Sequence, residues 1–131
     1  MAGELAANLK VGTWRSWHPN GQLRSEETFA ADGVLGGVLT WFASGSKESE
    51  AQWRGGAAVS GTLWYESGDL KEKGASQDGL LESWYDGGQL KFRGELASGQ
   101  RTGPWLFFRP DGTPDEEMSG QYEVGQRRGP L

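Results

Sequence analysis

The chain has 131 residues, a formal net charge of −5 at pH 7 and no cysteine. The lack of cysteine excludes a disulfide framework and a thiolate metal site, and the acidic balance argues against a nucleic-acid backbone as partner, because that requires clustered Lys and Arg. The chain has no Ile but seven Trp and 22 Gly, so we expect an aromatic, distributed core and no long helices.

An aromatic residue followed four positions later by Gly recurs along the chain. The intervals between successive glycines of this pattern are 24, 23, 20 and 24 residues. A period near 23 is too short for helical-hairpin repeats but accommodates two short strands and two turns. The five pairs are Trp17 and Gly21, Trp41 and Gly45, Trp64 and Gly68, Trp84 and Gly88, and Phe108 and Gly112.

A second register supports the repeat. Residues 3–14 align without a gap on residues 94–105 and again on residues 120–131, with Gly at the first and tenth position of each segment. The pattern predicts one array domain, 1–131, with five complete repeats and a partial sixth. The approximate bounds are 3–27, 28–51, 52–74, 75–94, 95–119 and, for the partial repeat, 120–131.

Turn-forming sequences separate the aromatic segments. Pro19-Asn20-Gly21 and Pro110-Asp111-Gly112 combine a fixed φ with residues that accept the left-handed region. The segments Gly99–Gly103 and Gly125–Gly129 indicate the turn at the other end of the hairpins. The 20-residue interval between Gly68 and Gly88 predicts a shortened turn at 76–79. Because a single hairpin is only marginally stable, we expect neighbouring hairpins to pair edge to edge.

This repeat resembles the MORN repeat, specifically the bacterial variant in antitoxin-like YwqK-type proteins. The residues that carry the resemblance are Gly99, Gly103, Trp105, Phe108 and Gly112, with their counterparts in the other repeats. Val59 replaces the repeat glycine, and Lys47 the usual leucine. The resemblance implies an all-β fold: an elongated, single-layer antiparallel sheet of stacked β-hairpins. It also implies a protein-contact or membrane-associated role.

Side chains alternate across a strand, which divides the aromatic residues between two faces. We expect the stripe of Trp17, Trp41, Trp64, Trp84 and Phe108 to form the packed interior. The opposite face is the candidate partner-binding surface, since an exposed aromatic strip often marks an interaction site. Its candidate residues are His18, Phe42, Tyr65, Tyr85 and Phe107.

No catalytic arrangement is evident. His18 is the only histidine, and it occupies a repeat position that holds Phe42, Tyr65, Tyr85 or Arg109 elsewhere, which favours a repeat variant over a general base. Neither a nucleophile elbow nor a phosphate-binding glycine loop occurs. Acidic side chains recur near one repeat position, which indicates a solvated rim. We therefore predict no catalytic residues, no metal and no cofactor.

The sequence favours a non-catalytic, cytoplasmic protein-interaction scaffold, antitoxin- or immunity-like, whose partner would be a protein such as a toxin. One alternative is small-ligand binding, of a carbohydrate or a choline-type headgroup, by stacked Trp and Tyr. Another is a structural or membrane-proximal spacer, although scarce Lys and Arg clusters argue against membrane attachment. Homodimerisation through a terminal sheet edge is a further hypothesis, with Arg127 and Arg128 as edge-protecting charges.

Overall fold

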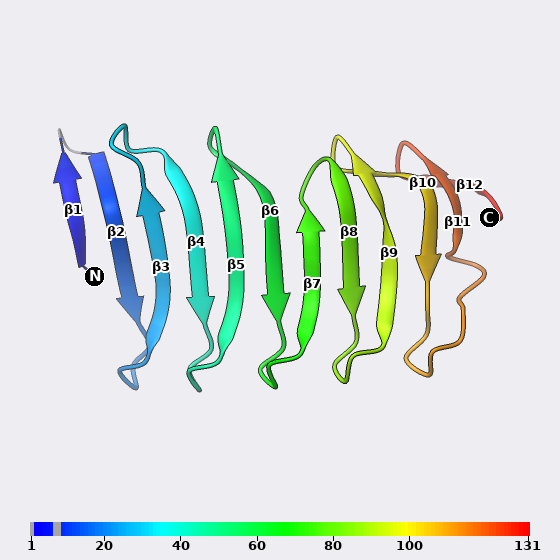
Figure 1. Cartoon of the computed structure of the whole chain (residues 1–131), viewed down its shortest axis with the longest axis horizontal. Coiled ribbons are helices and arrows are strands. Elements are labelled where there is room, and N and C mark those ends of the chain that lie inside the picture. Colours follow the sequence, from blue (N-terminus) through cyan, green and yellow to red (C-terminus); the bar gives the residue numbers. More distant parts are fainter. Residues whose placement is uncertain (1, 7–8) are drawn as a thin grey trace. The chain divides into compact units, whose positions relative to one another are not determined.

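The computed structural model describes residues 2–6 and 9–131, which form twelve β-strands and no helix. Contacts divide the chain into two compact parts, an N-terminal module (Met1–Gly68) and a C-terminal module (Asp69–Leu131). The prediction of a single array domain stays a prediction. The strands of the N-terminal module are β1 (Ala2–Ala6), β2 (Leu9–Trp17), β3 (Leu23–Phe29), β4 (Leu35–Trp41), β5 (Lys47–Arg54) and β6 (Ala57–Trp64) (Figure 1). Those of the C-terminal module are β7 (Leu70–Ala75), β8 (Gly79–Trp84), β9 (Leu90–Ala97), β10 (Gln100–Phe107), β11 (Gly120–Glu123) and β12 (Gln126–Gly129).

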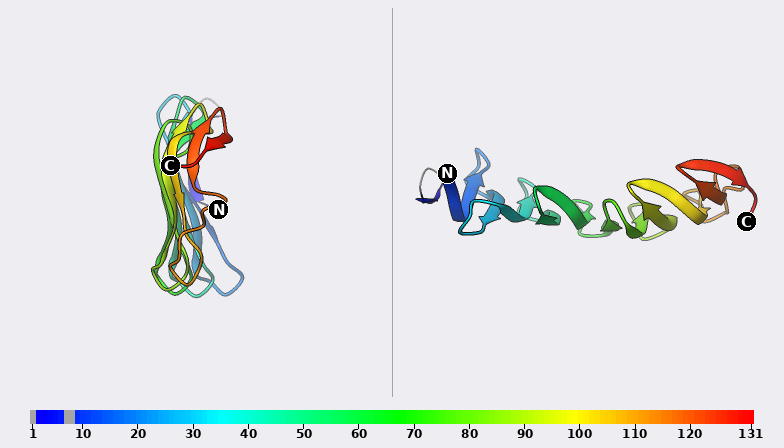
Figure 2. Two further views of the ribbon diagram at one scale, coloured as in Figure 1. Left: turned by 90° about the vertical axis from the view of Figure 1, so that its right-hand side faces the viewer. Right: turned by 90° about the horizontal axis from the view of Figure 1, so that it is seen from above.

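Within each module, every strand pairs antiparallel with the strand that follows it in the chain. The views in Figure 2 show the strands of each module as one layer. In the described part of the chain, no helix covers either face. The predicted all-β fold of antiparallel stacked hairpins is therefore confirmed.

The five glycines that define the repeat have one conformation. Their φ angles lie between +88° and +99°, a region that a side chain rarely tolerates. In every case the glycine N–H donates to the carbonyl three residues earlier, as Gly21 does to His18 at 2.9 Å. The periodic glycine is thus required by the turn that links the two strands of each repeat.

At the opposite end of the hairpins, three turns have two residues with positive φ. They are Gly55-Gly56, Ser98-Gly99 and Val124-Gly125, and they have the type I′ signs that match the twist of paired strands. The prediction of a shortened turn at 76–79 is wrong. The strands β7 and β8 have six residues each, whereas β5, β6, β9 and β10 have eight, so the repeat is shortened in its strands.

The hydrophobic core lies in the C-terminal module. Trp105, Phe107 and Tyr122 are 1%, 8% and 7% exposed, and the Phe107 ring centroid lies 5.9 Å from that of Trp105 and 5.7 Å from that of Phe92. These residues lie on the face opposite the stripe that we expected to be interior. That expectation is wrong, because Trp17 is 43% exposed and the other four members of the stripe are only half-buried.

Close packing of Trp against Gly explains the second register. A Cβ added to Gly94 would lie 2.1 Å from the ring of Trp105, whose Nε1 donates to the carbonyl of Glu95 at 2.9 Å. In the N-terminal module, Trp14 packs in the same way on Gly3, and its Nε1 donates to the Glu4 carbonyl at 3.0 Å. The alignment of residues 3–14 with 94–105 therefore reflects one packing unit.

Candidate protein-contact surfaces

The face of β2–β6 opposite the Trp17 stripe carries a broad apolar surface, which we call the aromatic face of the N-terminal module. Its side chains are only half-buried, and no described residue of this module is buried. The described strands of this module form a single layer (Figure 2), so no second layer of strands or helices packs on this surface. The apolar members are Trp14, Phe29, Val38, Phe42, Trp53, Leu63 and Tyr65, together with His18.

A row of hydroxyl side chains crosses this face and explains why no core forms there. Ser16 bonds to Ser25, and Thr40 bonds to Ser49, across paired strands. The corresponding position in β10 is occupied by Phe107, which fills the core of the C-terminal module. Small polar side chains replace rings in this row, and the neighbouring aromatic residues are left partly exposed.

The five predicted partner-binding residues are divided between the two modules. His18, Phe42 and Tyr65 are half-buried in the N-terminal module, and Tyr85 is half-buried in the C-terminal module. Phe107 lies in the core at 8% exposure, because it packs among other rings, so its side chain is not available on the surface. Binding by the other four residues stays a prediction.

Two of these residues also connect neighbouring repeats. The Nε2 atom of His18 lies 2.8 Å from the carbonyl oxygen of Trp41, and the Tyr85 hydroxyl donates to the carbonyl of Phe108 at 2.8 Å. Each bond joins residues 23 positions apart. The sequence analysis missed this role, although the signal was present as a polar aromatic side chain at one repeat position.

Cations cover several aromatic rings from within the chain. The Lys10 ammonium lies 5.0 Å from the Trp14 ring centroid and 5.7 Å from that of Phe29. Arg101 lies 5.0–5.4 Å from the rings of the core residues Trp105, Phe107 and Tyr122. A cation that lies above the face of an aromatic ring is attracted to it electrostatically. The sequence signal that we missed is a cation two residues before a glycine and four before a Trp.

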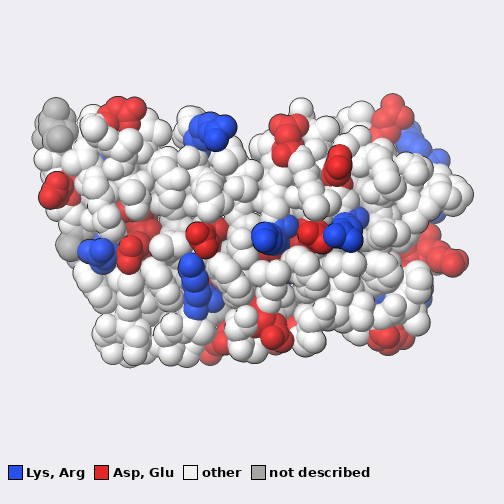
Figure 3. Space-filling model, viewed as in Figure 1, with Lys and Arg blue, Asp and Glu red and all other residues white. Residues whose placement is uncertain are grey.

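In each module, the face opposite the aromatic side chains carries a pair of opposite charges. Arg15 lies 3.5 Å from Glu26, and Arg93 lies 3.0 Å from Glu82. Figure 3 shows basic and acidic side chains interspersed across the strands on one side of each module. These exposed pairs contribute little to stability, and they share this face with the half-buried Trp side chains of the stripe.

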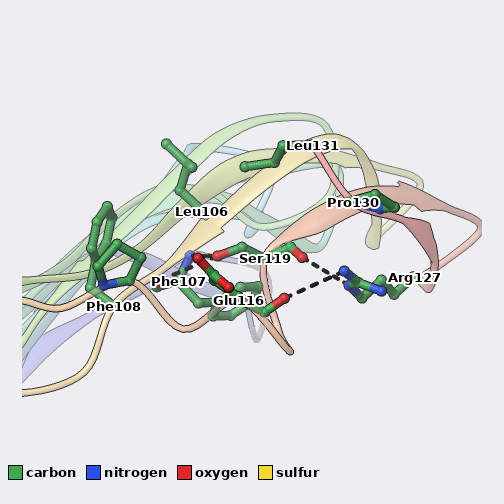
Figure 4. A pocket seen from close by; sticks show the side chains of 9 residues that line it. Leu106, Phe107, Phe108, Glu116, Ser119, Arg127, Pro130 and Leu131 are labelled. Carbon is green, nitrogen blue, oxygen red and sulfur yellow. Dashed lines mark hydrogen bonds between the residues drawn. The ribbon is translucent and has the colours of Figure 1, made fainter.

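An apolar pocket of about 570 Å³ lies in the C-terminal module (Figure 4). It adjoins a departure from the repeat: after Pro114, the chain forms a turn in which the Asp115 carboxylate accepts from the N–H groups of Glu117 and Met118. Ser119 ends this turn, and its hydroxyl bonds to the backbone of Phe107. The pocket is lined by Leu106, Phe107, Phe108, Pro114, Glu116, Ser119, Arg127, Pro130 and Leu131.

Arg127, which we expect from the sequence to protect the terminal edge, also makes contacts within the chain. Its Nε donates to the Ser119 carbonyl at 2.8 Å, and an Nη donates to the Glu116 carbonyl at 3.4 Å. The guanidinium thus connects β12 to the turn that precedes β11. It also forms one wall of the pocket.

Among residues 2–6 and 9–131, no three His, Asp or Glu side chains gather in a group suited to a metal ion. The same residues contain no helix that is long and apolar enough to cross a membrane.

Comparison with known families supports the repeat. Residues 10–31 match the family model described as MORN repeat variant. This segment contains Lys10, most of β2, the first glycine turn and β3, and the other four glycine turns share its geometry. Repeats of this type are generally associated with protein or membrane-lipid interactions. No curated protein matches the chain at a significant level.

Proposed function

We propose that the chain is a non-catalytic interaction scaffold that binds a protein partner through the aromatic face of its N-terminal module. The observation that carries the proposal is that none of the described residues of this module is buried, although seven apolar side chains lie on this one face. Burial of apolar surface away from water lowers the free energy by roughly 25 cal/mol per Å². Binding of a protein surface to these strands would therefore be favourable, because it would bury apolar side chains that the single-layered sheet leaves partly exposed.

A protein fits this face better than a small cation does. The aromatic side chains are spread over strands β2 to β6 instead of converging on one pocket. Where rings do cluster, as around Trp14 and Phe29, the chain supplies its own cation in Lys10. Large, half-buried aromatic side chains are typical anchors of protein interfaces.

The nature of the partner is the finer part of the proposal. The resemblance to antitoxin-like repeat proteins supports a toxin as the partner and the cytoplasm as the compartment. Pull-down from the native host, with identification of the captured protein by mass spectrometry, tests this point. Capture of a protein that does not inhibit growth when expressed alone would contradict the antitoxin role and leave the scaffold role intact.

Substitution of the aromatic face tests the scaffold role directly. In the double variant Phe42→Ser and Trp53→Ser, we expect at least a tenfold loss of partner affinity, because interface anchors each contribute about 1–2 kcal/mol or more. The matched control is Trp17→Ser, which removes a 43% exposed Trp from the opposite face and should bind normally. Circular dichroism verifies that all variants fold.

Two results would contradict the scaffold proposal. Equal affinity in the double variant and the control would place the contact elsewhere. Vesicles that bind the chain and lose that binding in the double variant, with no protein captured, would assign the face to lipid.

A further inference from the structure

The pocket of the C-terminal module exists because the repeat is interrupted at one point. In the other repeats the glycine turn leads directly into a strand that begins with Leu or Lys, such as Leu23 or Lys47. Pro114 occupies this position after Gly112, and the chain bends at 115–119 before β11 begins at Gly120. The C-terminal end of β10 therefore has no partner strand on the side of β11, apart from the isolated bridge between Phe108 and Pro114.

The edge of β10 is already satisfied there and does not invite strand addition. The Phe107 N–H donates to the Ser119 hydroxyl at 2.8 Å, and the Asp115 N–H donates to the Phe107 carbonyl at 2.8 Å. Ser119 itself is 8% exposed. The pocket therefore offers side-chain contacts rather than free backbone groups.

The walls of the pocket are apolar with one oriented cation. Leu106 is 38% and Leu131 58% exposed, and both lie at its rim in Figure 4. The Arg127 guanidinium is fixed by carbonyl oxygens, and in the described part of the chain no carboxylate lies within ion-pair distance of it. Glu116 adds the only negative side chain of the lining.

We propose that this pocket receives an apolar side chain of a protein partner, with an adjacent carboxylate of that partner pairing with Arg127. The inference rests on the proposed scaffold function and adds a contact made by the C-terminal module. A protein segment fits because only Phe107 and Ser119 of the nine lining residues are buried, whereas small-molecule sites enclose most of the ligand surface. The charge of Arg127 selects an acidic neighbour over a basic one.

Peptide titration followed by ¹⁵N NMR tests the proposal with defined probes. The probes are blocked tripeptides of sequence Asp-Leu-Asp, Lys-Leu-Lys and Asp-Gly-Asp. Of the three peptides, we expect only Asp-Leu-Asp to cause saturable chemical-shift changes at the amides of Leu106, Phe107 and Ser119. The variant Glu116→Gln removes a competing negative charge and should tighten this binding about threefold. The variant Arg127→Lys keeps the positive charge but loses the two parallel N–H donors of the guanidinium, so it should weaken the binding about threefold.

A matched pair of leucines provides the control. Leu106→Ser should abolish the shifts, whereas Leu80→Ser, at a leucine of 45% exposure outside the pocket, should leave them unchanged. Equal binding of Asp-Gly-Asp, insensitivity to Leu106→Ser, or stronger binding of decanoate than of Asp-Leu-Asp would overturn the proposal. Absence of peptide binding, with partner capture still dependent on Phe42 and Trp53, would overturn this inference alone.

Discussion

At the scale of single residues, the contact between Trp105 and Gly94 shows how closely the core is packed. Trp105 is 1% exposed, and its ring occupies the space that a side chain at position 94 would need. The missing side chain of glycine is therefore part of the packing. Glycine is needed at position 94 because the Trp105 ring packs directly on the backbone, whereas the turn glycines are needed because their φ angles are positive.

The substitution Gly94→Ala tests this packing. The added methyl group would lie 2.1 Å from the ring of Trp105, so we expect the free energy of unfolding to fall by about 3 kcal/mol, as overpacked cores do. Urea unfolding measures the change. Gly129→Ala is the control, because a Cβ there meets nothing within 4 Å and should cost less than about 0.5 kcal/mol. Similar losses in the two variants would contradict the packing role.

Asp111 provides a prediction on pH. Hydrogen bonds from the Thr113 hydroxyl and then the Thr113 N–H lower the pKa of Asp111 below its ordinary value of 3.8. Because the folded pKa is depressed, this stabilising contribution is complete above the unfolded pKa. It is lost as the pH falls through the lower, folded value.

Titration of the Asp111 carboxyl by NMR should therefore show a midpoint below 3.8. In Asp111→Asn the turn should persist, since Asn20 makes the same bond to the N–H of Gln22 at 3.0 Å in the first repeat, and the acid dependence from this group should disappear. A midpoint at or above the ordinary value would contradict the prediction.

At the scale of elements, the type I′ turn between β11 and β12 contains an unfavourable residue. Val124 has φ +51° and is 63% exposed, and the left-handed region is costly for a β-branched side chain. Asn tolerates this region. We expect Val124→Asn to raise the free energy of unfolding by about 1 kcal/mol, measured by urea unfolding. The change Ser98→Asn, at the equivalent turn residue, should have a smaller effect, and an equal gain in both would argue against the role of β-branching.

The turns and strand alternation could be predicted from the sequence, because both depend on local, periodic residues. The buried face could not. The buried face depends on a few residues that do not follow the repeat. The paired residues Phe92 and Phe107 occupy the positions that the paired residues Ser25 and Ser16 occupy in the first repeat. Tyr122, on the strand next to β10, completes the core. A repeated stripe of Trp indicated an interior, yet aromatic side chains at one period need not be covered in a single layer.

The candidate site was predictable only in part. Strand parity placed Phe42 and Tyr65 on one face, and the structure leaves them half-buried there. Parity could not show that Phe107 is enclosed, since its neighbours Trp105 and Tyr122 are brought together by strand pairing. The pocket was also beyond the sequence analysis, because it follows from the non-periodic turn at 115–119.

At the scale of the whole molecule, the two modules should differ in local stability. All the buried residues among those described lie in the C-terminal module, and protection from hydrogen exchange follows burial and packing. We expect the slowest amides in β9, β10 and β11, and faster exchange in β2–β6. Exchange measured by NMR at pH 7 checks this order, and equal protection in both modules would show that a further contact covers the N-terminal one.

Binding of the partner should reverse part of this difference. If the aromatic face is the contact, amides of β3–β5 should gain protection in the complex, because a covered sheet opens less often. A gain confined to β10–β12 would instead assign the main contact to the pocket.

The bonds between residues 23 positions apart have a consequence for how such a chain changes length in evolution. Within its module, each of the bonds from His18 to Trp41 and from Tyr85 to Phe108 connects one glycine turn to the residue that precedes the next glycine turn. Gain or loss of one whole period between two glycine turns preserves these partners, whereas a partial period mismatches them. Duplication and deletion by whole repeats are thus the length changes that keep these bonds.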